Sequence, residues 1–371
     1  MGDFTERVKR KNKYNLSKLP LTISAKYGLV DQITFFNKIV ASTDMSNYYL
    51  LKKGEFAYNK SYSNDYPWGA IKRLDNYEQG VLSALYICFT TQDNIESDFI
   101  LQYFESPKWH KSVSEIAVEG ARNHGLLNIS VQDFFQTYHY VPKEKKEQTK
   151  IATLLYLIDE RISTQNKIIE DLKKLKSAII EMEYSHNTKS NLHIGDFIEQ
   201  TSKRNKDGAI QNVLSVSNSQ GFIQQSEQFE NRSVASDDTS NYKIVERNSF
   251  AFNPARINVG SIARLATFDR GIVSPMYICF RTRDNLFPEY LDYYFESKQF
   301  STEIQKRLEG SVRQCLSFEG LCNIPLSIPT IEVQQQTGKR LSTLAQEIKL
   351  EIDFLELLQK QKKFLLYQMF I

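Results

Sequence analysis

Residues 83–94 read SALYICFTTQDN, and residues 274–285 read SPMYICFRTRDN. The two tyrosines of these stretches stand at 86 and 277, so 277 − 86 gives a shift of 191 residues. A repeat of this length defines the folding unit before any local pattern is considered. The sequence therefore predicts two related halves that perform a similar task at two places.

The similarity continues on both sides of this stretch, through most of the 371 residues. Phe56-Ala57-Tyr58-Asn59 returns as Phe250-Ala251-Phe252-Asn253, and Tyr103-Phe104-Glu105-Ser106 returns as Tyr294-Phe295-Glu296-Ser297. Glu119-Gly120 returns as Glu309-Gly310. Matches that keep their order over so many blocks indicate a duplication, with insertions confined to a few loops.

Composition indicates a folded protein with room for two domains. Hydrophobic residues make up 41% and aromatic residues 12%, and this length suffices for two buried cores. No apolar run approaches the roughly 18–20 residues of a membrane helix, so we expect no membrane association. Residues 1–7 contain no apolar stretch typical of a secretory signal, and we therefore expect a cytoplasmic protein.

The cysteines do not suggest a disulfide framework or a metal site. Cys88 and Cys279 stand at the same place in each repeat, within apolar runs where a thiol packs as a small hydrophobe. Cys315 and Cys322 lack histidines at ligand spacing. We expect four structural thiols and no metal.

The net charge of +3 is too small to indicate nucleic-acid binding by itself. Positive residues nevertheless gather in one short stretch of each half, at Arg7, Lys9, Arg10, Lys11 and Lys13, and at Lys203, Arg204 and Lys206. A basic run is usually a solvated surface. Its recurrence in both copies favours DNA contact modestly.

Each copy begins with a globular part that mixes short strands and helices. Runs rich in β-branched and aromatic residues predict strands at 85–89, 276–280 and 324–328. Helical spacing predicts short helices around 97–106 and 288–308. We expect a first globular domain at 1–142 and a second at 187–329.

Each copy ends in a long helix, expected at 143–186 and at 330–371, downstream of Pro142 and Pro329. Apolar residues step by three and four, as in a coiled-coil seam, and the first helix would be about 60 Å long. The residues expected to pair the helices are Leu155, Ile158, Ile162, Ile169, Leu172, Ile348, Ile352 and Leu355, and Leu175, Ile179 and Met182 continue the first stripe beyond the polar Gln165.

We expect the two helices to pair with each other in antiparallel orientation, because neither can leave its stripe in water and the duplication relates them. The alternatives are packing of each helix on its own globular part or on a second copy of the chain. The predicted fold is α+β, with two recognition domains related by a pseudo-twofold axis and separated by an antiparallel coiled coil.

The sequence contains no constellation that predicts catalysis. Asn253-Pro254 resembles the start of the amino-methyltransferase motif, but Ala255 replaces its second proline and no aromatic residue follows. Gly338-Lys339 lacks the glycine-rich loop of a nucleotide site. The five histidines have no metal or triad spacing and do not recur between the halves. We therefore expect no intrinsic enzymatic activity.

Polar and basic loops do recur, at 59–73 and 253–264 and at 119–124 and 309–314. Arg, Lys, Asn and Gln are the side chains that read base edges and hold phosphates. The expected DNA contacts are Lys9, Arg10, Lys11, Asn59, Lys60, Tyr62, Lys72, Arg73, Arg122 and Asn123 in the first half, and Lys203, Arg204, Asn253, Arg256, Asn258, Arg264, Arg313 and Gln314 in the second. The alternative is that they are ordinary surface loops, in which Tyr66 and Trp68 belong to the core.

Taken together, the duplication, the Tyr-Ile-Cys-Phe-x-Thr-x-Asp-Asn run, the Glu-Gly…Arg loop and the long helix closing each half resemble the specificity subunit of a type I restriction–modification enzyme. The resemblance covers essentially the whole chain and rests on the ordered set rather than on one motif. It implies that each recognition domain reads half of a split DNA site through the major groove. The helices then set the spacing between half-sites.

The resemblance also implies partners. Two methyltransferase subunits would dock on the outer faces of the helices, and a motor-nuclease subunit would join them on double-stranded DNA. S-adenosylmethionine, ATP and Mg would be bound by those partners, and no cofactor is expected in this chain. One departure concerns the lead-in 191–194 of the second copy, whose counterpart is missing before Gly2. The alternative functions are a two-headed coiled-coil scaffold for proteins and, third, an enzyme.

Overall fold

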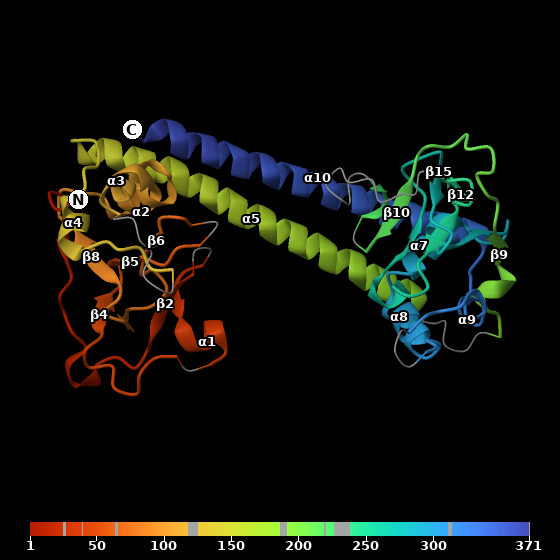
Figure 1. Cartoon of the computed structure of the whole chain (residues 1–371), viewed down its shortest axis with the longest axis horizontal. Helices are drawn as coiled ribbons and strands as arrows, with labels where there is room; N and C mark the ends of the chain where they lie inside the picture. Colours follow the sequence, from red (N-terminus) through yellow and green to blue (C-terminus); the bar gives the residue numbers. More distant parts are fainter. Residues whose placement is uncertain are drawn as a thin grey trace. The chain divides into compact units, whose positions relative to one another are not determined.

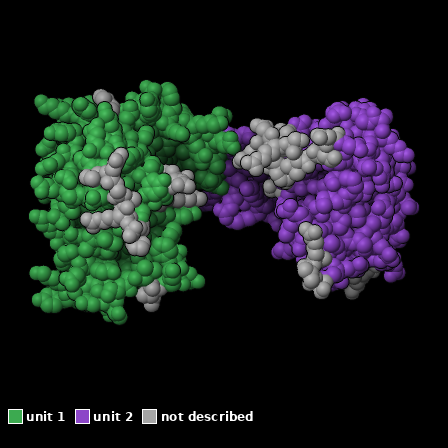
Figure 2. All heavy atoms as spheres, viewed as in Figure 1, with its two compact units in different colours: residues 1–166, 354–371 green, residues 167–353 purple. Residues whose placement is uncertain are grey.

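The computed structural model describes residues 1–24, 27–38, 40–63, 66–117, 125–185, 191–218, 220–225, 238–310 and 314–370. It divides into two compact units, unit 1 with residues 1–166 and 354–371, and unit 2 with residues 167–353 (Figure 2). Each unit holds one strand-rich head and a part of each of two long helices, α5 (Lys145–Tyr184) and α10 (Ile331–Met369) (Figure 1).

The head of unit 1 is built on an antiparallel sheet in the order β1-β8-β5-β6, with two further two-stranded ladders, β2–β3 and β4–β7. The strands are β1 (Thr5–Arg7), β2 (Leu21–Ser24), β3 (Gly28–Asp31), β4 (Tyr49–Lys52), β5 (Phe56–Asn59), β6 (Ala70–Arg73), β7 (Gln79–Leu82) and β8 (Ile87–Thr91). The helices are α1 (Gln32–Phe36), α2 (Ser97–Glu105), α3 (Lys108–Ile116) and α4 (Val131–Gln136).

The sheet of unit 1 has a hydrophobic core on each face, because successive side chains of a strand point to opposite sides. Phe56 and Phe89 stack at 5.2 Å on the face that α2, α3 and α4 cover. Ala57 and Cys88 face the ladders on the other side. Burial raises the pKa of the Cys88 thiol to about 12, so this cysteine packs as a neutral group.

Unit 2 repeats this architecture strand for strand. Its sheet has the order β9-β16-β13-β14, and its ladders are β10–β11 and β12–β15. The strands are β9 (Ile198–Thr201), β10 (Leu214–Ser217), β11 (Gly221–Gln224), β12 (Lys243–Glu246), β13 (Phe250–Phe252), β14 (Ile262–Arg264), β15 (Arg270–Val273) and β16 (Ile278–Thr282), and the short helices are α7 (Pro288–Tyr294), α8 (Lys298–Gln305) and α9 (Phe318–Cys322). Every strand pairing of the first head recurs, which confirms the duplication and the α+β class.

Three local expectations need correction. The strands expected at 85–89 and 276–280 begin two residues later, as β8 and β16. The run 324–328 forms no strand, because Pro325 and Pro329 remove backbone donors; it lies extended in the core, where Leu326 donates to the Leu192 carbonyl at 2.9 Å. The helix expected at 288–308 is broken at Ser297, whose side chain caps α8.

The two long helices pack against each other in antiparallel orientation within each unit. In unit 1, Asp159 of α5 binds Lys362 of α10 at 2.5 Å, and Arg161 lies over the Phe354 ring at 5.3 Å. In unit 2, Glu183 of α5 forms an ion pair with Arg340. In unit 1, Asp159 contacts Lys362 and the later residue Arg161 contacts the earlier residue Phe354, so the two helices run in opposite directions.

The packed seam of α5 follows a seven-residue repeat. Leu155 and Ile169 are buried, and Ile158, Ile162 and Leu172 are half-buried. On α10 Ile348 is buried, and Ile352 and Leu355 are half-buried. The expectation that Leu175 and Met182 continue the stripe is wrong. They are 50% and 60% exposed, because from Lys176 onward α5 turns Ile179 and Ile180 into the core of the second head instead.

A buried glutamine joins each long helix to its head. Gln148 of α5 accepts a hydrogen bond from the Glu96 amide before α2 at 2.7 Å and donates to the Pro142 carbonyl at 2.8 Å. Gln334 of α10 accepts from the Phe287 amide before α7 at 2.8 Å and donates to the Pro329 carbonyl at 2.9 Å. The same side chain therefore fixes the first turn of each long helix.

Within the described part of the chain, no helix has the length and apolarity required to cross a membrane.

Candidate nucleic-acid interface

Asn12, in the basic stretch of the first half, is fully buried and closes a short loop. Its side-chain amide donates to the Ser17 carbonyl at 2.9 Å, and its Oδ1 accepts from the Ser17 amide at 2.9 Å. Its amide also donates to the Met45 carbonyl at 3.3 Å, and its backbone N–H donates to Tyr48. All hydrogen-bonding groups of this side chain are used, so residues 13–16 form a loop held at both ends.

Asn205 closes the corresponding loop of the second half, since 205 − 12 gives 193. It is fully buried, and its side chain donates to the Ile210 carbonyl at 2.9 Å and accepts from the Ile210 amide at 3.1 Å. Its backbone N–H donates to Tyr242 at 3.0 Å. We call the segments closed by Asn12 and Asn205 the asparagine loops, and residues 13–16 and 206–209 their tips.

The two tips differ in sequence although the closing bonds are the same. The first reads Lys13-Tyr14-Asn15-Leu16 and the second reads Lys206-Asp207-Gly208-Ala209. Identical support with different exposed residues is the arrangement expected of two readers with different targets.

Tyr14 is the most exposed large side chain of the first tip, at 92%. Its φ of 61° lies in the left-handed region, which a residue with a bulky side chain adopts only at a cost in free energy. The asparagine bonds overcome that cost and present the ring to solvent. Gly208, with φ 64°, adopts the same region without strain.

The cations around the first tip divide into two groups. Lys9 and Lys13 are exposed. Arg10 is turned inward, where its guanidinium donates to both oxygens of Glu55 at 2.7 and 2.6 Å. Lys11 donates to the Asn47 carbonyl at 2.9 Å and lies over the Tyr49 ring at 3.7 Å. The exposed lysines face solvent, whereas Arg10 and Lys11 stabilise the loop.

In the second half, Lys203 and Lys206 are exposed, and the exposed Arg204 donates to Asn241 Oδ1 at 2.8 Å. The Lys203 carbonyl accepts from the Ile244 amide at 2.8 Å. The side chains of all three basic residues therefore remain at the surface while the backbone beneath them is tied to β12.

The loop between β5 and β6 is held by its own polar residues. Asn59 Oδ1 accepts from the Ser61 amide at 3.0 Å, and Lys60 donates to the Ile129 carbonyl at 3.0 Å. Tyr62 is 53% exposed, and its backbone N–H donates to Gly125 at 2.7 Å. Of the three expected contacts in this loop, Tyr62 alone is presented mainly to solvent.

The corresponding loop between β13 and β14 presents two polar side chains. Asn253 is buried; its Oδ1 accepts from the Ala255 amide at 3.1 Å and its amide contacts Met276 Sδ at 3.8 Å. Arg256 and Asn258 are exposed; Arg256 immediately precedes a short 3₁₀ turn (Ile257–Val259), and Asn258 lies within it. Asn253 thus shapes the loop, and Arg256 and Asn258 are its available polar groups.

Arg73 and Arg264 occupy equivalent positions and have equivalent ion pairs. Arg73 donates to Asp98 at the start of α2 at 2.7 Å, and Arg264 donates to Glu289 at the start of α7 at 3.1 Å. The arginine side chains are only 14% and 11% exposed. Lys72 is 8% exposed and binds Glu105 at 2.5 Å. These three expected DNA contacts therefore tie the edge strand of each sheet to the adjacent helices.

The remaining expected contacts lie in the second recurrent loop. Arg122, Asn123 and Arg313 fall outside the described residues. Gln314 is described and exposed.

Three site residues escaped the sequence reasoning. Asn12 and Asn205 follow basic pairs in the runs Arg10-Lys11-Asn12-Lys13 and Lys203-Arg204-Asn205-Lys206, and this recurrence could have identified them. Tyr14 has no sequence signal of its own, because only the backbone conformation shows that its ring is exposed.

Comparison with known proteins places this geometry in a family. A family model for the type I restriction modification DNA specificity domain matches residues 193–360. No curated protein sequence matches the chain.

Several solved structures share the fold over the whole chain. One, from work on complex assembly and conformational transition of the type I R-M system, is 15% identical with a TM-score of 0.58, covering 99% of this chain and 95% of that one. The S subunit of the type-I restriction-modification system from M. genitalium is 15% identical with a TM-score of 0.56, covering 100% and 94%. The HsdS subunit from Thermoanaerobacter tengcongensis is 15% identical with a TM-score of 0.49, covering 99% and 94%.

The family match in the second half, the repetition of that half's strand pairings in the first, and the fold shared over the full length agree with one another. The second half of the chain therefore matches the type I restriction modification DNA specificity domain, and the first half repeats the strand pairings of that half.

Proposed function

We propose that the chain is a specificity subunit of a type I restriction–modification system and reads a bipartite DNA site, with one half-site recognised by each head. The observation that carries the proposal is the pair of asparagine loops. Asn12 and Asn205 make the same backbone bonds, whereas the tips they support carry different side chains. A shared support orients the protein on the duplex, and different side chains at its tip select different bases.

The exposed groups of each head have suitable chemistry. In unit 1, Lys9 and Lys13 supply positive charge and Tyr14 supplies a ring for base or sugar contact. In unit 2, Lys203 and Lys206 supply the charge, and Arg256 and Asn258 supply groups that read base edges. Arg73, Arg264 and Lys72 are left out of the proposed interface, because carboxylates already neutralise them.

The isolated chain should bind DNA weakly. Its net charge is only +3, and much of the affinity of DNA-binding proteins comes from release of counterions by basic residues. We assign the missing affinity, and the catalysis, to two methyltransferase subunits and a motor-nuclease subunit. S-adenosylmethionine, ATP and Mg would be bound by those partners.

The exposed faces of the long helices support docking of the methyltransferase. Leu350, Leu357 and Phe364 of α10 are spaced by seven residues and are 63%, 61% and 62% exposed. Leu154, Ile168, Leu175 and Met182 of α5 are separated by multiples of seven and are also exposed. A seven-residue repeat keeps such side chains on one face of a helix, so each helix carries a second apolar stripe outside the seam.

The test exchanges one tip for the other. Lys13 and Lys206 are the same residue type, so Tyr14→Asp, Asn15→Gly and Leu16→Ala together place the second tip on the first loop. Methylation-aware sequencing of cells carrying this subunit with its methyltransferase should show that one half-site changes and the other stays. The reciprocal exchange, Asp207→Tyr, Gly208→Asn and Ala209→Leu, should change the other half-site. Change of both half-sites by one exchange, or of neither by both, would contradict the proposal.

A further inference from the structure

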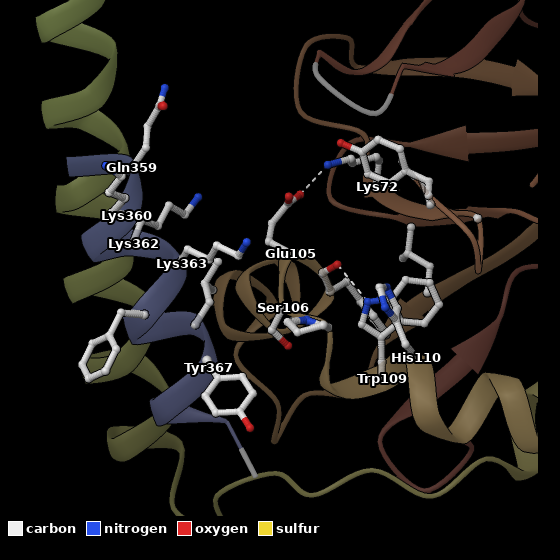
Figure 3. A pocket seen from close by; sticks show the side chains of 18 of the residues that line it. Lys72, Glu105, Ser106, Trp109, His110, Gln359, Lys360, Lys362, Lys363 and Tyr367 are labelled. Atoms are coloured by element: carbon white, nitrogen blue, oxygen red, sulfur yellow. Dashed lines mark hydrogen bonds and ion pairs between the residues drawn. The ribbon is translucent and has the colours of Figure 1, made fainter. Parts of the chain in front are cut away.

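Unit 1 contains a cleft of about 750 Å³ between the head and α10 (Figure 3). The edge strand β6 and the α2–α3 junction form one wall, and the C-terminal turns of α10 form the other. Much of the lining is apolar or aromatic, with Phe104, Trp109, Phe364 and Tyr367 among its residues. We call it the lysine cleft, because Lys360, Lys362 and Lys363 line its α10 wall and Lys72 lines the wall opposite.

The charges in the lysine cleft are unequal. Glu105, which lies between the two walls, is the one acidic residue among the described lining residues, and Lys72 neutralises it at 2.5 Å (Figure 3). Lys362 is drawn to Asp159 of α5, also at 2.5 Å. Lys360 is 75% exposed, and its Nζ lies 4.0 Å from Glu356 Oε2, at the outer limit of an ion pair. Lys363 is exposed. The cleft therefore combines an apolar lining with an excess of positive charge.

The second head has a corresponding cleft of about 530 Å³, in unit 2, and an ion pair between two of its lining residues spans it. Lys176 of α5 donates to both oxygens of Glu296, at 2.9 and 2.7 Å. Lys176 and Glu296 correspond to Lys362 and Glu105, since 362 − 176 gives 186 and 296 − 105 gives 191. The same pair of residues thus bridges the cleft in one unit and is separated in the other.

Two residues cause the separation in unit 1. Lys72 forms an ion pair with Glu105, and Asp159 forms one with Lys362. The residues at the matching positions of the other repeat are Ala263 and Ala345, at the same shifts of 191 and 186. Alanine cannot form an ion pair with either charge, so Lys176 and Glu296 pair with each other in unit 2. The open lysine cleft is therefore specified by two side chains that the second repeat lacks.

We propose that the lysine cleft receives an acidic amphipathic segment of the methyltransferase subunit. Its apolar side chain would insert beside Phe364 and Tyr367, and its carboxylates would face Lys360 and Lys363. This inference rests on the proposed docking of that subunit on the helices.

Continuity with the docking stripe supports this occupant. Within unit 1 the stripe consists of Leu357 and Phe364, and Phe364 also lines the cleft. A partner lying along the stripe therefore reaches the cleft without a gap. A DNA backbone fits less well, because phosphates pair with exposed cations and gain nothing from an apolar lining.

The first test reverses the charge of the cleft without touching the stripe. The double variant Lys360→Glu with Lys363→Glu should bind the methyltransferase subunit about tenfold more weakly at low salt, and the difference should shrink at high salt because the attraction is screened. The matched control is Lys339→Glu with Lys349→Glu, two exposed lysines of the same helix. It should bind like the unmodified chain.

A second variant bridges the cleft with an ion pair by copying the other repeat. Lys72→Ala with Asp159→Ala should free Glu105 and Lys362 to pair as Glu296 and Lys176 do. It should retain its fold, checked by circular dichroism, and lose methyltransferase affinity to a similar extent.

Photo-crosslinking identifies the occupant. A photoreactive amino acid at position 363, in the full complex on DNA, should crosslink to an acidic segment of the methyltransferase, whereas one at position 349 should not give that product. Crosslinks to DNA alone would overturn the inference. So would equal methyltransferase affinity for all variants and the unmodified chain, although that result would leave the proposed docking intact. Failure of the unmodified chain to bind the methyltransferase would instead refute the docking itself.

Discussion

Arg264 of β14 donates from Nε to Asp292 Oδ2 of α7 at 3.1 Å, and this pair fastens the edge of the second sheet to its helix. Burial raises the pKa of the Asp292 carboxyl to about 6, and Arg264 limits that rise. A carboxyl whose pKa is higher in the folded protein than in the unfolded chain binds protons on folding. Its contribution to stability therefore falls as pH rises from about 4 to about 6.

Replacement of this arginine should affect stability more than recognition. In Arg264→Leu, Asp292 and Glu289 lose their counter-charge, and we expect a loss of about 1–3 kcal/mol at pH 8, moderated by the partial exposure of both acids. The loss should be smaller at pH 5, because Asp292 can then take up a proton. Thermal unfolding at the two pH values measures this difference. Arg256→Leu is the control: its exposed side chain should leave stability unchanged and weaken one half-site.

Loss of the buried glutamine should loosen a head from its long helix. In Gln334→Leu the Phe287 amide loses its acceptor inside the protein, which costs about 1–3 kcal/mol. Hydrogen exchange should show faster exchange of the Phe287 amide, and chemical denaturation should show the loss of stability. Gln335→Leu, at the exposed neighbouring position, should change neither. Equal behaviour of the two variants would show that Gln334 has no such role.

The two faces of α5 should respond differently to the same chemical change. Ile169 is 7% exposed in the seam, so Ile169→Ser should destabilise the protein by about 2–5 kcal/mol. Leu175 is 50% exposed, so Leu175→Ser should change stability by less than about 0.5 kcal/mol but weaken methyltransferase binding. Urea unfolding and a binding titration separate the effects. Unchanged binding by Leu175→Ser would remove this residue from the docking surface.

The duplication allowed the fold to be predicted in outline, because a repeat preserves strand pairing even where individual strands are too short to recognise. The helix seam was predicted less well. Apolar spacing favoured Leu175 after Leu172, whereas in the structure Leu175 is exposed and Lys176 faces the head, where Glu296 neutralises it. A sequence pattern that counts only apolar residues cannot represent a helix position filled by a charge with a partner outside the helix.

The candidate site could be predicted only in part, because the sequence does not show which cations are already paired. Arg73 and Arg264 have the residue type that reads guanine, yet Asp98 and Glu289 neutralise them. Those acids recur at the same shift as the arginines, 289 − 98 and 264 − 73 both giving 191. A charge pair that recurs at one shift is an indication of a structural role that sequence reasoning could have used.

Tyr14 provides a test that separates strain from function. Glycine adopts a φ near 61° without steric cost but loses more backbone entropy on folding, so Tyr14→Gly should leave stability within about 1 kcal/mol of that of the unmodified chain. The same variant should recognise one half-site less well, because the exposed ring is gone. Thermal unfolding and methylation-aware sequencing measure the two effects. Tyr138→Ala removes a ring that is 88% exposed but lies outside the asparagine loop, and its methylation pattern should be unchanged. If Tyr14→Gly keeps or gains stability and the DNA is methylated as before, the left-handed conformation of Tyr14 does not serve DNA recognition. The first tip then reads DNA through its other residues or not at all.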